Sequence, residues 1–168
     1  MPSDDLKDAT LGPGFFEERL LLKIEGWNCN LHVGLSVDLT PVEYRFQGGL
    51  NYTRGFDLEC RVVAPKALSG KYIRVRLSPI GPDVKFGTDG LDEVGQLNIH
   101  SPQPEKPDFS ATLLIPEDAL SVVATCLGLS WKYVHMWMFD QSADRASVSA
   151  FSFSSDVHKN LDAWIAGG

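Results

Sequence analysis

Apolar residues recur at every second position over several stretches of this chain. The longest stretch runs from Cys29 to Leu39, where polar residues or glycine fill the intervening positions. A period of two places alternate side chains on opposite faces of a strand, whereas a helix would scatter the same residues around its circumference. The pattern therefore predicts a chain built mainly from strands.

Shorter alternating stretches predict further strands at 56–62, 73–77 and 109–115, with less regular strands at 17–25, 43–47, 94–99, 131–139 and 146–154. Turn residues separate them at Gly48-Gly49, Ser69-Gly70, Pro79 to Pro82 and Asp140 to Asp144. Many short strands with regular turns are typical of an antiparallel β-sandwich, and a closed up-and-down β-barrel is the alternative. Gly26-Trp27 before a long strand resembles the start of up-and-down ligand-binding barrels, which supports that alternative.

Two short helices interrupt the strands. We expect one near 117–127, because Pro116 suits a helix start and Leu120, Val123, Ala124 and Leu127 share one face. A second is expected near 156–166, with Asp156 as its cap and a stripe of Val157, Leu161, Trp164 and Ile165.

The segments 48–77 and 95–138 carry short matching motifs in the same order, which suggests two related units. If the strands near 57–61 and 72–76 of the first unit form a hairpin, one register gives favourable pairs throughout. That register sets Asp57 opposite Arg76, Glu59 opposite Arg74, and Arg61 opposite Tyr72. It predicts a solvated, charged face.

The second unit has an aromatic row at the equivalent outward positions: Tyr133, His135, Trp137 and Phe139. Val134, Met136 and Met138 occupy the other face, so this strand is apolar on both sides and something should cover the row. The helix at 156–166 is one candidate cover. Alternatively, a second copy of the chain or another protein could cover the row. In a third interpretation the row lines a ligand groove with His135 as its polar group.

Size and charge limit the classes of function. A chain of 168 residues is expected to form a flexible N-terminal segment, 1–14, and a single β domain, 15–168. The net charge of −7 argues against nucleic-acid binding, and no stretch is long and apolar enough for a transmembrane helix. Cys29 and Cys60 lie among aliphatic neighbours and are expected to be buried thiols, which favours the cytoplasm.

Candidate chemistry is sparse. His32, Asp38 and Glu43 form a polar strip that could bind a sugar or other small molecule, or serve a hydrolase. Asp89, Asp92 and Glu93 lack the spacing of calcium loops, and Asp140, Ser142 and Asp144 are typical of a hairpin turn, so no metal and no cofactor is expected. The leading hypothesis is a non-enzymatic binding or assembly module that uses the aromatic row for self-association or a protein partner. The polar strip is the runner-up, and a structural role as a shell or tail component is a third reading.

Overall fold

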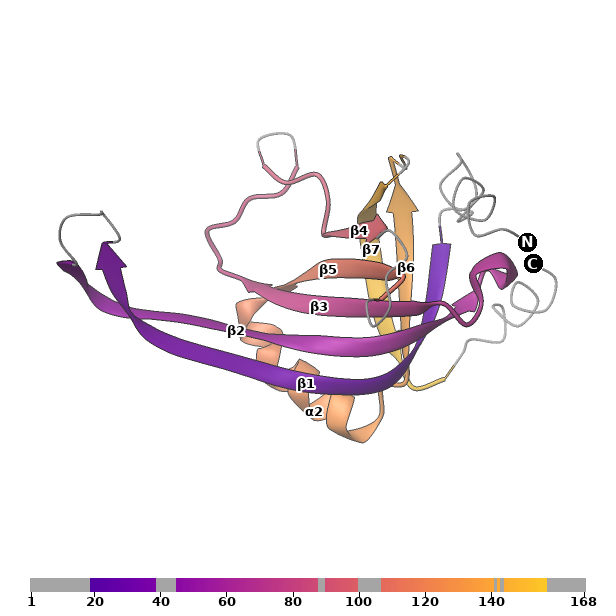
Figure 1. Cartoon of the computed structure of the whole chain (residues 1–168), viewed down its shortest axis with the longest axis horizontal. Coiled ribbons are helices and arrows are strands. Elements are labelled where there is room, and N and C mark those ends of the chain that lie inside the picture. The colour runs from indigo at the N-terminus through magenta and orange to yellow at the C-terminus, as the bar shows by residue number, and fades with distance from the viewer. Residues whose placement is uncertain are drawn as a thin grey trace.

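The computed structural model describes residues 19–38, 45–87, 90–99, 107–140, 142 and 144–156. In this part of the chain there are seven strands: β1 (Arg19–Asp38), β2 (Arg45–Ala64), β3 (Tyr72–Ile80), β4 (Gly95–Ile99), β5 (Phe109–Pro116), β6 (Tyr133–Phe139) and β7 (Arg145–Ser154). Two 3-10 turns, η1 (Lys66–Leu68) and η2 (Glu117–Ala119), and the helix α2 (Leu120–Leu129) complete the described elements (Figure 1).

The strands form a closed barrel in the order β1-β2-β3-β5-β4-β7-β6. Pairing of β1 with β6, from Arg19↔Trp137 to Lys23↔Tyr133, closes the sheet. The barrel that stood as the alternative therefore replaces the expected sandwich, and closure removes open edges only over the residues that pair around the barrel. It is not a simple up-and-down barrel, because β3 and β5 are parallel neighbours and β4 lies beyond β5.

Two strands are much longer than the pattern predicts. The stretches 17–25 and 29–39 merge into β1, and 43–47 and 56–62 merge into β2. A bulge between Ile24 and Gly26 gives β1 one residue more than β2. The β1 positions that face the core therefore switch between even and odd residue numbers at this bulge. The turn expected at Gly48-Gly49 is wrong, because both glycines lie within β2 at a register shift against Leu35 to Val37.

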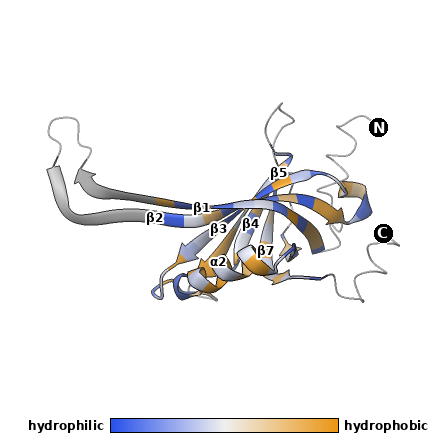
Figure 2. Cartoon of the chain, turned by 90° about the horizontal axis from the view of Figure 1, so that it is seen from below, coloured by the Kyte–Doolittle hydropathy of each residue, from blue (hydrophilic) through white to orange (hydrophobic). Residues whose placement is uncertain are grey.

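The barrel interior is the hydrophobic core. Leu22, Leu58, Leu77 and Met136 are fully buried there, together with residues from every strand. Helix α2 adds Val123 and Leu127 to the same core. It begins three residues later than expected, after the 3-10 turn η2, and its predicted apolar face is confirmed. Figure 2 shows α2 against the underside of the sheet, with mostly neutral and hydrophobic positions.

The register predicted for the first charged hairpin is confirmed. β2 and β3 pair Asp57 with Arg76, Glu59 with Arg74, and Arg61 with Tyr72. Arg76 Nε lies 2.9 Å from Asp57 Oδ1, and the Arg61 guanidinium lies 5.3 Å from the centre of the Tyr72 ring. Glu59, Arg61, Arg74 and Arg76 are all exposed, as a solvated face requires.

The predicted second unit has no corresponding hairpin. Its strands β5 and β6 are not neighbours in the barrel, since β4 and β7 lie between them. The relationship between segments 48–77 and 95–138 therefore stays a prediction. The predicted flexible segment 1–14 and nearly all of the predicted helix 156–166 lie outside the described residues.

The cysteines divide into two kinds of environment. Cys60 is buried in the barrel, and burial, with smaller contributions from the charges of Glu25 and Glu59, raises its pKa to about 12. Cys29 is exposed, so the expectation that it is buried is wrong. The cause is its position opposite Phe56, where β2 reaches the end of its pairing with β3 and the barrel ends.

Candidate functional site

The most distinctive feature of the molecule is a two-stranded extension of the barrel. Pairing of β1 with β2 continues to Asp38↔Arg45, whereas β1 pairs with β6 only over Arg19–Lys23 and β2 with β3 only over Phe56–Arg61. Residues 30–38 and 45–55 therefore form a ribbon of two strands, here called the projecting hairpin (Figure 1). At about 3.3 Å per residue, its nine β1 residues span about 30 Å. Within the described part of the chain, no third strand pairs with it.

Apart from the register shift at Gly48-Gly49 in β2, the projecting hairpin lacks the devices that protect exposed strand edges. Natural edge strands are kept short or carry lysine, proline or frequent charges. The segments 30–38 and 45–55 contain neither lysine nor proline, and Asp38, Arg45 and Arg54 are their only charged residues. In sequence, apolar residues alternate along β1, and the register pairs Val33 with Tyr52 and Leu35 with Leu50. This composition is typical of strands that are paired or covered.

Helix α2 lies alongside the base of this hairpin. The 3-10 turn η2 that leads into it is tied to β2 by an ion pair between Arg54 and Glu117. Near its end, a Cβ atom placed on Gly128 would lie only 3.9 Å from the Trp27 ring. Because Arg54 pairs with Leu31, the helix runs beside β1 from Leu31 back to Trp27.

Four large apolar side chains of β1 and α2 are exposed, and we call them the basal patch. The exposed fractions are 40% for Trp27, 67% for Leu31, 58% for Val122 and 82% for Leu129. Helix α2 has no charged residue in its ten positions. Its exposed face carries Val122 and Leu129, seven residues apart, beside the polar side chains of Ser121 and Thr125.

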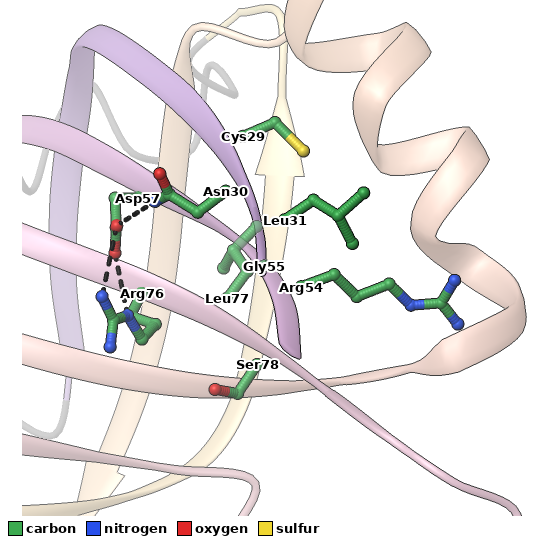
Figure 3. A pocket seen from close by; sticks show the side chains of 9 residues that line it. All are labelled: Cys29, Asn30, Leu31, Arg54, Gly55, Asp57, Arg76, Leu77 and Ser78. Carbon is green, nitrogen blue, oxygen red and sulfur yellow. Dashed lines mark hydrogen bonds and ion pairs between the residues drawn. The ribbon is translucent and has the colours of Figure 1, made fainter. Parts of the chain in front are cut away.

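On the other face of the sheet, a polar network holds the base of the hairpin against β3. Asp57 accepts two hydrogen bonds from Arg76, at 2.9 and 3.3 Å, and one from Asn30 at 2.7 Å (Figure 3). The hydrogen bond to Asp57 and its charge raise the pKa of Arg76. Figure 3 shows Asn30, Asp57 and Arg76 on one side and Leu31 and Arg54 on the side of α2. These residues border a hollow of about 640 Å³, but its carboxylate is already paired and is poorly suited to acid–base work.

The aromatic row lies on β6, between β1 and β7, with Val134, Met136 and Met138 in the core on its other face. His135 is 9% exposed, and its ring centre lies 3.9 Å from that of Trp137. Tyr133, Trp137 and Phe139 are half-buried. The row is therefore partly accessible, and its role in binding stays a prediction.

The predicted polar strip is spread along β1. His32 and Asp38 are six residues apart in this strand, which is about 20 Å at the usual rise, and Glu43 lies outside the described residues. In the acidic loop at 89–93, the carboxylate of Glu93 lies 3.4 Å from the Arg145 guanidinium. In the turn at 140–144, Ser142 contacts Asp144 and the Arg145 carbonyl, as in a hairpin connection. Among the described residues, no three potential metal ligands come together, and no helix could cross a membrane.

The sequence reading missed the projecting hairpin and the basal patch. Two signals were present: an unbroken alternation of eleven residues from Cys29 to Leu39, about twice the usual strand length, and a helix without charges. No family model matches the chain, and neither a curated protein nor a solved structure matches it.

Proposed function

We propose that this protein is a non-enzymatic assembly module that associates with further copies of itself, and that the projecting hairpin is its main contact element. The observation that carries the proposal is the two-stranded ribbon beyond the end of the barrel. An isolated two-stranded hairpin is at best marginally stable in water and needs a third strand or a covering surface. Assembly with another chain would supply that support.

The basal patch supports the same function. Monomeric soluble proteins rarely leave several large apolar side chains together in water, and such patches mark contact surfaces. Leu31 lies in the hairpin, and Trp27, which α2 approaches at Gly128, lies three residues before it, so a chain bound to the hairpin can cover both side chains. Interface cores are enriched in aromatic residues and depleted of charge, and helix α2 carries no charged residue and approaches Trp27.

A light-scattering measurement of molar mass over a range of protein concentrations tests the proposal. One chain has a mass of 18.5 kDa, and we expect the native protein to give a multiple of that value. Leu35→Lys places a charge at an apolar position of the hairpin and should return the mass to that of one chain. Ala67→Lys adds the same charge on the exposed turn η1 and should leave the mass unchanged. A native mass of 18.5 kDa at all concentrations would overturn the proposal.

The aromatic row is the second candidate contact for the same function. Ala150 of β7 is exposed and pairs with Trp137, so Ala150→Lys places a charge beside the row without touching the hairpin. If Ala150→Lys gives single chains while Leu35→Lys keeps the native mass, the contact lies on the row and the hairpin has no part in it.

A further inference from the structure

We infer that two copies associate by antiparallel pairing of β1 with β1, around a two-fold axis at Gly34. This inference rests on the proposed function and names the partner as a second copy of this chain. The geometry starts from the free edge of β1, which beyond Ile24 has no strand partner in the described part of the chain. Backbone groups along such an edge can pair with another strand.

Of the two edges of the projecting hairpin, that of β1 is better suited to pairing. From Asn30 to Asp38 it has nine residues with a single charge. The corresponding segment of β2 contains Arg45 and Arg54 and is interrupted by the register shift at Gly48-Gly49. Arg54 also forms an ion pair with Glu117, which places η2 close to this end of β2.

A second copy fits this edge because a strand can always pair with itself about a two-fold axis. In such a pair, residue i faces residue j with a constant sum i + j, and both copies make the same contacts. Apolar positions of β1 in 29–37 have odd numbers, so they face one another only if the sum is even. An odd sum would set every apolar residue type opposite a polar one or glycine.

A sum of 68 pairs all nine residues of the segment 30–38 with their counterparts. Gly34 then faces itself, and a glycine inside a strand often marks a place where another backbone approaches closely. Asp38, the only charge in the segment, faces Asn30 of the second copy, so no like charges meet. An amide opposite a carboxylate is a compatible pair because it can donate a hydrogen bond to it.

The same register brings the second hairpin to the basal patch. With Asp38 of one copy opposite Asn30 of the other, the end of each hairpin lies next to the neighbour's Leu31 and near the start of α2, where Arg54 contacts Glu117. Each copy therefore supports the other's ribbon and covers exposed apolar side chains. The expected product is a symmetric dimer.

Disulfide cross-linking tests the register. The variants Gly34→Cys, Val33→Cys and Leu35→Cys are each made in a background with Cys29→Ser and Cys126→Ala, leaving only buried Cys60. Directly opposed residues of antiparallel strands have Cα atoms about 4.5–5.5 Å apart, within the range of a disulfide. Diagonal neighbours lie about 7–8 Å apart, which is too far. With a sum of 68, Gly34→Cys faces itself, whereas Val33→Cys and Leu35→Cys meet their own copies only diagonally.

We expect Gly34→Cys to cross-link under mild oxidation and the other two variants to remain largely uncross-linked. A mixture of His32→Cys and Ser36→Cys proteins of different tag length should give a mixed disulfide, which tests the same register without changing the glycine. Faster cross-linking of Val33→Cys or Leu35→Cys would overturn the inference. So would a native mass of two or more chains with no cross-link in any variant, although the proposed function would then stand. A native mass of one chain would overturn both the inferred β1–β1 pairing and the proposed function.

Discussion

The ion pair between Asp57 and Arg76 offers a quantitative test of the register at the base of the projecting hairpin. Two hydrogen bonds join these side chains, and the side chain of Asp57 is only 16% exposed although that of Arg76 is 62% exposed. Coulomb's law at 2.9 Å gives about 1.4 kcal/mol in bulk water. Exposed pairs measured in proteins are worth about 0.2–1 kcal/mol. The two-bond geometry favours the upper end, so we expect a coupling free energy of about 1 kcal/mol.

A double-mutant cycle isolates this coupling. Asp57→Ala, Arg76→Ala and the double variant are unfolded in urea beside the native chain, at one protein concentration and with equal association state confirmed by light scattering. The cycle on Glu59 and Arg74 is the matched control. These residues face each other in the same two strands, but the structure places no ion pair between them. Their coupling should be below about 0.3 kcal/mol.

Two outcomes would refute this reasoning. A coupling near zero for Asp57 and Arg76 would mean that the ion pair adds nothing to the free energy of unfolding. An equal or larger coupling for Glu59 and Arg74, which face each other without an ion pair, would mean that the hydrogen-bonded geometry of Asp57 and Arg76 does not determine the coupling.

Three further predictions concern the core, the thiols and a close backbone contact. Leu77→Ala should lower the free energy of unfolding, measured by urea titration, by about 2–5 kcal/mol because Leu77 is fully buried. Leu129→Ala, at an exposed position, should change it by less than about 0.5 kcal/mol. Similar losses in the two variants would contradict the described core. Iodoacetamide should alkylate Cys29 readily and Cys60 only after unfolding, as peptide mass mapping can show. In the folded protein the pKa of Cys60 is about 12, whereas in the unfolded chain it is near 9.0. Between these pH values the unfolded state therefore binds fewer protons than the folded state. The free energy of unfolding should therefore fall as pH rises through this window, by at most about 1.4 kcal/mol per pH unit from this thiol. The fall should be less steep in Cys60→Ala. Equal slopes in the two proteins would refute the raised pKa of Cys60. Gly55→Ala should lower the melting temperature, because its Cβ would lie 2.8 Å from the Leu77 carbonyl oxygen, and an unchanged value would show that β3 is not so close.

The sequence was most informative where local chemistry decides the structure. Alternation located the barrel strands, and opposite charges were sufficient to predict the pairing of β2 with β3 before any fold was known. The helix after Pro116 was also predicted, three residues too early, because its apolar face is a local signal and the acidic residues Glu117 and Asp118 belong to the 3-10 turn before it.

The remaining features depend on how strands meet across the chain. Closure of the sheet needs β1 to pair with β6, more than a hundred residues away, and alternation looks the same in a sandwich and in a barrel. The exposure of Cys29 could not be predicted either, because it depends on where β3 stops supporting β2. Gly48-Gly49 in sequence fits a turn and a bulge equally well, because glycines occur in both.

The candidate site was less predictable than the fold. The aromatic row was recognised from residue types, but its partial burial depends on neighbouring strands. The projecting hairpin required the strand bounds, because only the different lengths of the pairings of β1 and β2 reveal a ribbon without support. The sequence shows apolar alternation equally well inside a barrel and beyond its end.

Hydrogen exchange at increasing protein concentration tests the central claim most directly, because edge amides of β1 change partners on assembly. We predict that exchange of some backbone amides in 30–38 slows as concentration rises, while amides of 73–77 in β3 exchange at a constant rate. Exchange in 30–38 that is equally fast at every concentration would show that the hairpin remains in water and that assembly does not occur there.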